Sequence, residues 1–118
     1  AAAHGIQKGF TFIPALHQQL PGFNVAFCVL AQLVLENSLI ELKEVMDFSD
    51  SVGLPICFAD LGYVDVVPEE VRTAAEKACV PTSTIHNMPF EVAATMVYEA
   101  LMAADAYGRA YHAQKKMN

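Results

Sequence analysis

The fold is decided by one apolar stretch of the chain, Phe23-Asn24-Val25-Ala26-Phe27-Cys28-Val29-Leu30-Ala31-Gln32-Leu33-Val34-Leu35-Glu36. Between Val25 and Leu35 only Gln32 is polar, so a helix over this stretch carries apolar side chains on every face. In a water-soluble domain, such a helix is surrounded by other parts of the protein. The stretch therefore predicts a central helix that is buried from all sides.

Helical spacing of apolar residues also predicts the elements on either side of this stretch. Residues 1–9 are expected to form a helix that Gly9 stops, and Pro21-Gly22 is expected to form a turn. A single helical turn is expected between residues 54 and 61. The later helices are expected to run from Ser38 to Gly53, from Pro68 until Pro81 stops the helix, and from about Val92 to about Ala113. The prediction is one all-α domain, residues 1–118, built as a bundle of about five helices.

Local signals support the helix that begins after Ser38. Ser38 and Glu41 have the spacing of a capping box, in which a hydroxyl and a carboxylate satisfy the first amide donors of a helix. Apolar residues of this helix are expected on one stripe, from Leu39 through Leu42 and Met46 to Val52. In the helix after Pro68, the inner face is expected to consist of Val71, Ala74, Ala75 and Ala78.

Composition limits the possible partners. The 118 residues include 13 acidic and seven basic side chains, for a net charge of −6. This balance disfavours nucleic-acid binding and attraction to an anionic membrane. Hydrophobic residues make up 54% and charged residues 17% of the chain, against about 25% charged in a typical domain. We therefore expect apolar surface covered by a partner: a homo-oligomer, most simply a two-fold dimer around the opening helix or Val25 to Leu35, or a missing nucleotide-binding domain.

The cysteines and the apolar segments predict the compartment. The three cysteines, Cys28, Cys57 and Cys79, include no CxxC pair, which argues against a disulfide framework and fits a reducing compartment. No signal peptide is recognisable, and the longest apolar stretch is too short to span a bilayer. The chain is therefore predicted to be cytoplasmic. Because it has no initiator Met, we also expect it to be a piece of a longer protein.

Three polar residues near the start are the candidates for a ligand pocket. His4 and Gln7 lie three residues apart, which places them on one face of the opening helix. His17 lies in a predicted loop with Gln18 and Gln19. The alternative interpretation of each is a local hydrogen-bonding group, since Gln is a poor metal ligand and none of the three has a metal partner at a recognisable spacing.

The other titratable residues show no catalytic pattern. His112 is interpreted as a cation near a helix end, and Asp60 and Asp65 have no partner at a helical spacing. Asp105 is expected to pair with Arg109 across one turn. The sequence has no nucleophile elbow, no P-loop and no glycine-rich dinucleotide motif. The residue types alone therefore assign no catalytic residue.

Several short motifs, taken in order, resemble the C-terminal half of bacterial glycerol dehydrogenases, which belong to the iron- or zinc-dependent alcohol dehydrogenase family. The resemblance covers essentially the whole chain, and it implies the helical domain of an enzyme that uses NAD and zinc to oxidise glycerol. The motifs are Val25-Ala26-Phe27, Gln32-Leu33-Val34-Leu35-Glu36-Asn37, Gly53-Leu54-Pro55-Ile56, Thr84-Ile85-His86-Asn87-Met88-Pro89 and Ala103-Ala104-Asp105-Ala106-Tyr107-Gly108.

The resemblance fails at the zinc ligands. The family's opening helix resembles Ala-His-x-x-His-Asn-Gly, in which the second His binds zinc, and Gln7 occupies that position here. The family's other ligand His precedes a Gly-Glu-Lys-Val-Ala-Phe-Gly motif, and Pro21 occupies that position here. The third ligand, an Asp, and the glycines that bind the NAD pyrophosphate have no counterpart in these 118 residues. We therefore expect no catalytic zinc and no NAD in this chain, because such a zinc needs about three protein ligands.

Two functional hypotheses follow from this mixture of match and departure. In the first, the chain is the metal- and substrate-side domain of a glycerol dehydrogenase-like oxidoreductase, inactive by itself. In the second, it is a degenerate, non-catalytic homologue that acts as a binding or assembly protein. In either case, if a small polyol or an anion binds this chain, it is expected to bind at His4, Gln7 and His17.

Overall fold

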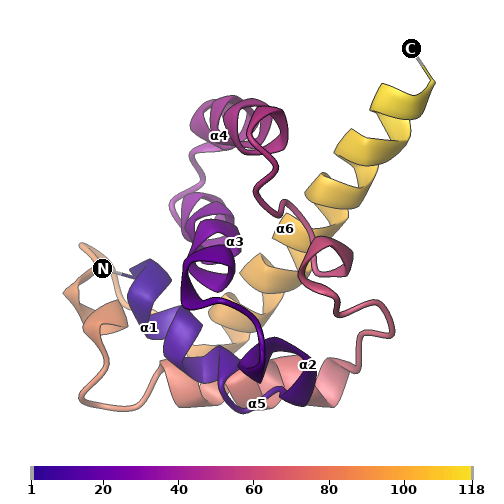
Figure 1. Cartoon of the computed structure of the whole chain (residues 1–118). Helices are drawn as coiled ribbons and strands as arrows, with labels where there is room; N and C mark the ends of the chain where they lie inside the picture. The colour runs from indigo at the N-terminus through magenta and orange to yellow at the C-terminus, as the bar shows by residue number, and fades with distance from the viewer. Residues whose placement is uncertain (1, 118) are drawn as a thin grey trace.

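A computed structural model of the chain describes residues 2–117 (Figure 1). These residues contain helices and no strand, so the all-α prediction is confirmed. The α-helices of this part of the chain number six, one more than predicted, and two short 3-10 helices join them. In order, the elements are α1 (Ala2–Phe10), α2 (Pro14–His17), α3 (Pro21–Leu35), α4 (Leu39–Ser51), η1 (Ala59–Leu61), α5 (Pro68–Ala78), η2 (Thr84–Asn87) and α6 (Ala94–Lys116).

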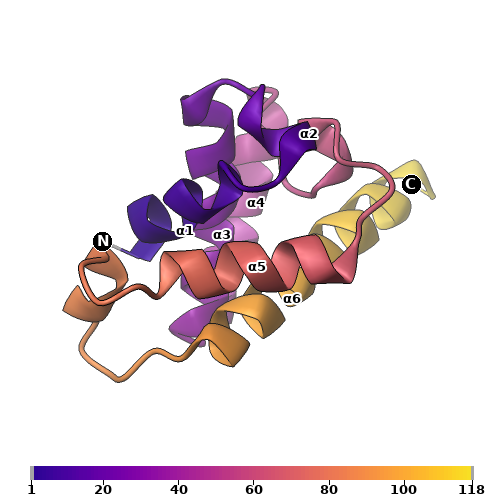
Figure 2. The same ribbon diagram turned by 90° about the horizontal axis from the view of Figure 1, so that it is seen from below.

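Helix α3 is central to the arrangement. It packs against α1, α4 and α6, while α5 closes the other side by packing against α1 and α6. Seen from below, α5 lies beside α1 and crosses near the first turns of α6 (Figure 2). Helix α4 packs on α3 at the end opposite α5, and the last turns of α6 extend past the body of the bundle (Figure 1).

Two helices begin at prolines for which a loop or a turn was predicted. Pro21 is the first residue of α3, so the predicted turn at Pro21-Gly22 is wrong. Pro14 likewise begins α2, which makes the predicted loop around His17 a helical turn. The first position of a helix suits proline because its fixed φ is already helical and its missing N–H leaves no unmade bond. The same role was predicted correctly for Pro68.

Gly9 does not stop α1. The helix continues through Gly9 to Phe10, and a Cβ at Gly9 would collide with the carbonyl oxygen of Ala74 on α5. The glycine is therefore explained by the close approach of two helices. The first predicted residue of this helix, Ala1, lies outside the described residues.

Helix α3 is less buried than predicted. Phe27, Leu30 and Ala31 have no exposed surface, but Val25, Val29 and Val34 are only half-buried. The prediction of a helix buried from all sides is therefore wrong for one face. The remaining helices of the described chain leave part of this apolar surface uncovered.

The core is built around a group of rings from separate segments. The ring of Phe27 on α3 lies 4.8 Å from that of Phe58, and Tyr63 meets Phe58 edge-on at 5.4 Å. Phe10 of α1 completes the group at 6.1 Å from Phe58. Offset and edge-on contacts of this kind add to the stabilisation that burial provides.

The turn between α3 and α4 replaces the predicted capping box. Asn37 adopts a left-handed conformation with φ 56°, and the amide of Ser38 donates to the carbonyl of Leu33. This is a Schellman-type end of α3. Ser38 precedes α4, but its side chain makes no capping hydrogen bond, so that prediction is wrong.

The inner faces of the later helices are largely as predicted. The predicted inner face of α5, with Val71 and Ala74 among its members, is buried. On α4 the predicted stripe is only partly correct. Leu42 and Met46 are buried, whereas Leu39 and Val52 are exposed.

No described helix is long and apolar enough to cross a membrane. Within residues 2–117 the three cysteines are free thiols; Cys28 and Cys57 are buried and Cys79 is half-buried.

Candidate functional site

The predicted pocket residues lie on the first two helices. On α1, His4 is exposed and Gln7 is half-buried, and His17 is exposed at the end of α2. Nearby, the amide of Ala3 donates to the side-chain oxygen of Gln32 at 3.0 Å, which explains the polar residue within apolar α3. The start of α1, which carries two of the three predicted residues, is thus held against α3, and none of the three lines the surface hollows that the described residues form between α1 and α5 and between η1 and α6.

Neither residue at the two positions that the resemblance matches to zinc ligands, Gln7 and Pro21, is a zinc-type ligand. Pro21 forms the first turn of α3 and offers no side-chain donor, and Gln7 offers only a neutral amide. Zinc sites in proteins use Cys, His and carboxylate ligands. No catalytic step through zinc at these positions is therefore derived for this chain.

Asn24, one turn into α3, is a buried polar group close to these positions. Its side-chain nitrogen donates to the carbonyl of Leu16 at 2.9 Å, which ties α2 to α3. Its Oδ1 atom is buried without a hydrogen-bond partner among the described residues. Asn24 was not predicted as a buried polar site, because it lies in a stretch that was interpreted as an apolar helix.

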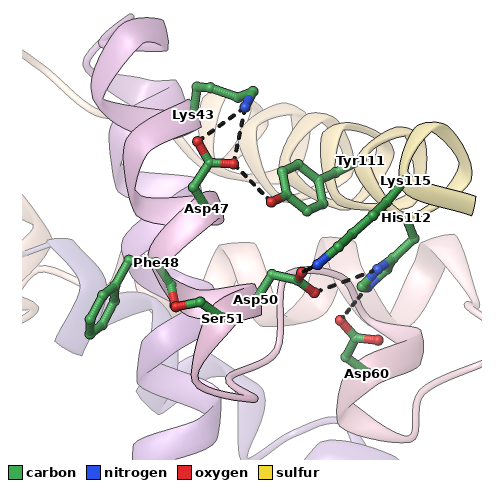
Figure 3. A network of polar contacts seen from close by, with 9 residues as sticks. All are labelled: Lys43, Asp47, Phe48, Asp50, Ser51, Asp60, Tyr111, His112 and Lys115. Atoms are coloured by element: carbon green, nitrogen blue, oxygen red, sulfur yellow. Dashed lines mark hydrogen bonds and ion pairs between the residues drawn. The ribbon is translucent and has the colours of Figure 1, made fainter. Parts of the chain in front are cut away.

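A second polar site lies between α4 and α6, where Figure 3 shows side chains of both helices pointing toward one another. Its outer part consists of Asp47, Lys43 and Tyr111. The carboxylate of Asp47 accepts from Lys43 at 3.0 Å and from the Tyr111 hydroxyl at 2.8 Å. The hydrogen bonds from Tyr111 and Lys43 hold the pKa of Asp47 below its usual value.

The inner part of this network is centred on His112. Its Nε2 atom lies 2.8 Å from Oδ2 of Asp60, and its Nδ1 atom lies 4.0 Å from Oδ1 of Asp50. Lys115 also pairs with Asp50 (Figure 3). Asp60, to which the sequence assigned no partner, therefore pairs with His112, which lies near the end of α6.

Cys57 adjoins this histidine and carboxylate. One donor atom each of Cys57, Asp60 and His112 lies within 4.8 Å of the other two. Burial raises the pKa of the Cys57 thiol. Burial also acts on Asp60, but hydrogen bonds from His112 and from the Ile56 amide outweigh it and hold the pKa of Asp60 below its usual value. The arrangement places a thiol, an imidazole and a carboxylate at one point.

Asp105 holds the segment that carries Cys57 against α6. It is 5% exposed, and its Oδ1 accepts the backbone amide of Phe58 at 2.8 Å. Its Oδ2 accepts from Arg109 at 3.0 Å, as the sequence spacing predicted. A Cβ at Gly108 would collide with the carbonyl of Ile56, so the same helix face approaches this segment at backbone distance.

Two further polar groups are structural. The hydroxyl of Tyr63 donates to Glu70 at 2.6 Å and accepts from the Val67 amide at 3.0 Å. Burial and the bond to Glu70 raise the pKa of Tyr63 to about 12. His86 lies with Nε2 at 3.1 Å from the carbonyls of Cys79 and Val80, so its role is local hydrogen bonding.

Comparison with known proteins identifies the class to which this fold and these motifs correspond. No protein-family model matches the chain. Curated relatives and solved structures do match it, and the matches are to the C-terminal portion of glycerol dehydrogenases. The chain spans about 30% of the length of the curated relatives it matches.

Three of the matching proteins are known or probable glycerol dehydrogenases from different organisms. The chain is 46% identical over 110 residues to a glycerol dehydrogenase of Pseudomonas putida, covering 92% of this chain and 30% of that protein. It superposes with a TM-score of 0.92 and 30% identity on the crystal structure of glycerol dehydrogenase from Schizosaccharomyces pombe, covering 100% of this chain and 31% of that one. For a probable glycerol dehydrogenase from Sinorhizobium meliloti the TM-score is 0.87 at 41% identity, over 92% of this chain and 31% of that one. The chain is therefore similar, in sequence and in fold, to the C-terminal helical portion of these enzymes.

Proposed function

We propose that this chain serves as the helical, metal- and substrate-side domain of a glycerol dehydrogenase-like oxidoreductase, and that by itself it does not catalyse alcohol oxidation. The observation that carries the proposal is the match over nearly the whole chain, in both sequence and fold, to that one portion of glycerol dehydrogenases. The inactivity follows from Gln7 and Pro21 at the inherited zinc positions. Without the metal, no Lewis acid lowers the pKa of the substrate hydroxyl.

A small polyol is the ligand class that this proposal assigns to the face bearing His4, Gln7 and His17. Each of these side chains offers hydrogen-bonding groups that suit the hydroxyls of a polyol. Their exposure fits a face that the remaining part of a longer enzyme covers. NAD is expected to bind outside these residues.

The test is a chimera in which residues 2–117 replace the corresponding C-terminal portion of the Pseudomonas putida glycerol dehydrogenase. We expect a folded protein that lacks glycerol-dependent NADH formation. The combined substitutions Gln7→His and Pro21→His are expected to restore zinc binding and part of the activity, since the third ligand then comes from the parent enzyme. The variant Gln18→His, a histidine added elsewhere on the same side of the chain, serves as the matched control.

Two outcomes contradict the proposal. Activity in the chimera without added histidines shows that the inherited zinc positions are not needed. A folded chimera that gains both histidines yet stays zinc-free and inactive shows that the chain does not retain the geometry of the pocket. Zinc is measured in a Cys57→Ser background, so that metal at the second polar site does not contribute.

The second candidate function, a non-catalytic binding or assembly protein, is favoured by exposed apolar side chains. Ile40 is 80% exposed and Phe48 is 62% exposed, both on the outer side of α4. Exposed apolar surface of this kind usually marks a contact with another protein. Under this alternative, the chimera fails to recover activity and the chain self-associates.

A further inference from the structure

The three side chains Cys57, Asp60 and His112 form a cluster that the functional proposal does not use. Cys57 and Asp60 belong to the segment between α4 and α5, and His112 belongs to α6. Their donor atoms lie within 4.8 Å of one another, although 52 residues separate Asp60 from His112. The fold therefore brings together three metal-ligating groups from two separate segments.

We propose that Cys57, Asp60 and His112 bind a zinc-type divalent transition-metal ion, which clamps α6 to the segment around η1. This site is distinct from the inherited zinc positions at Gln7 and Pro21. A thiolate, an imidazole and a carboxylate form a donor set typical of zinc, whereas Mg²⁺ and Ca²⁺ require oxygen ligands. Three protein ligands leave a fourth position open to water.

The distances suit a tetrahedral ion. With zinc bonds of usual length, the coordinating nitrogen and oxygen lie about 3.3 Å apart, and the nitrogen and sulfur about 3.6 Å apart. Nε2 of His112 and Oδ2 of Asp60 are now 2.8 Å apart. An increase of about half an ångström therefore opens enough room for the ion.

Accessibility also suits metal entry. The side chains of His112 and Asp60 are 34% and 31% exposed, while Cys57 is 2% exposed. His112, Asp60 and Asp50 line a surface hollow of about 260 Å³. The ion can reach Asp60 and His112 from this hollow, and a donor atom of Cys57 lies within 4.8 Å of theirs.

Charged residues next to the three proposed ligands also support a metal site. Asp50 lies 4.0 Å from Nδ1 of His112, the ring nitrogen opposite the one that faces Asp60. A carboxylate that hydrogen-bonds this ring nitrogen orients a metal-binding histidine and strengthens it as a ligand, and Asp50 takes this role if it moves closer than the present 4.0 Å. With the metal bound, three negative charges surround the site, from Cys57, Asp60 and Asp50. Lys115 adds one positive charge, so the net charge of these side chains is −2, which a divalent cation neutralises.

The experiment is a Co²⁺ titration of the full 118-residue chain with its thiols kept reduced, followed by competition with Zn²⁺. We expect one equivalent to produce thiolate-to-cobalt absorption in the near ultraviolet and visible bands of four-coordinate cobalt. Zn²⁺ is expected to remove both. Cys57→Ser should abolish the thiolate absorption, and His112→Asn should weaken Co²⁺ binding by more than the roughly tenfold loss typical of an outer contact.

Matched controls use cysteine and histidine residues elsewhere in the chain. Cys79→Ser changes the other partly accessible thiol, and His86→Asn changes a histidine that lies against backbone carbonyls. Both are expected to leave the affinity for Co²⁺ within about twofold of the parent, as is usual for residues without contact to a site. Circular dichroism of each variant establishes that its helices are intact.

Three results overturn the proposal. The first is the absence of thiolate-to-cobalt absorption in the folded parent chain. The second is an unchanged Co²⁺ affinity in folded Cys57→Ser and His112→Asn. The third is an equal loss of affinity in the control variants. If His112→Asn does not fold, Asp50→Asn replaces it, with an expected weakening of about tenfold.

Discussion

At the scale of single residues, Asp105 has the clearest effect on stability. Replacing it in Asp105→Ala leaves the buried amide of Phe58 without an acceptor. Because an unpaired buried amide costs about 1–3 kcal/mol, we expect the free energy of unfolding to fall by that amount. Urea denaturation followed by circular dichroism measures the change. Arg109→Ala removes only an exposed partner and should cost less than about 1 kcal/mol, so equal losses in the two variants would contradict this account.

Tyr63 gives a pH-dependent prediction. In the folded chain the pKa of Tyr63 is about 12. In the unfolded chain it is the usual tyrosine value of about 10. The contribution of this group to stability is therefore complete below about pH 10 and is lost as the pH rises toward 12. The hydrogen bond to Asp47 also raises the pKa of Tyr111. Absorbance titration at high pH should therefore show a late tyrosine phase, from which Tyr63→Phe removes one tyrosine equivalent. An identical late phase in the variant would contradict the assignment.

At the scale of elements, the approach of α6 to the segment before η1 depends on Gly108. In Gly108→Ala the new methyl group would collide with the Ile56 carbonyl, so helix and segment must separate. Overpacking of this kind costs about 1–3 kcal/mol, and we expect the melting temperature to fall accordingly. Gly22→Ala on α3 is the control, because no atom lies within 4 Å of its added methyl group. A parent-like melting temperature for Gly108→Ala would contradict the observed packing.

At the scale of the whole molecule, the prediction concerns self-association. Helix α3 has a half-buried apolar face, and Ile40 and Phe48 on α4 are largely exposed. Because surface of this kind is unfavourable in water, we expect the 118-residue chain to form a homo-oligomer, most simply a two-fold dimer. Sedimentation velocity at micromolar concentration measures the mass. A monomer of the 12.8 kDa chain mass that binds no hydrophobic dye would contradict the prediction.

Apolar patterning along the chain was enough to predict the helical class and most of the buried faces. Apolar residues at helical spacing identified α3, α5 and α6, because a helix brings positions three and four apart onto one face whatever surrounds it. The same local geometry gave the pairing of Asp105 with Arg109, and the motifs gave the correspondence to glycerol dehydrogenases. The prediction that Gln7 and Pro21 cannot act as zinc ligands also came from the sequence, because it depends on side-chain chemistry alone.

Which distant residues meet depends on how the helices pack against one another. Asp60 and His112 are 52 positions apart and come together because α6 packs against the segment before α5. Cys57 joins them through the same packing, and no local spacing signals it. The burial of α3 was overestimated for a related reason. A hydrophobic pattern shows that a face avoids water, but the number and placement of neighbouring helices decide how much of that face they cover.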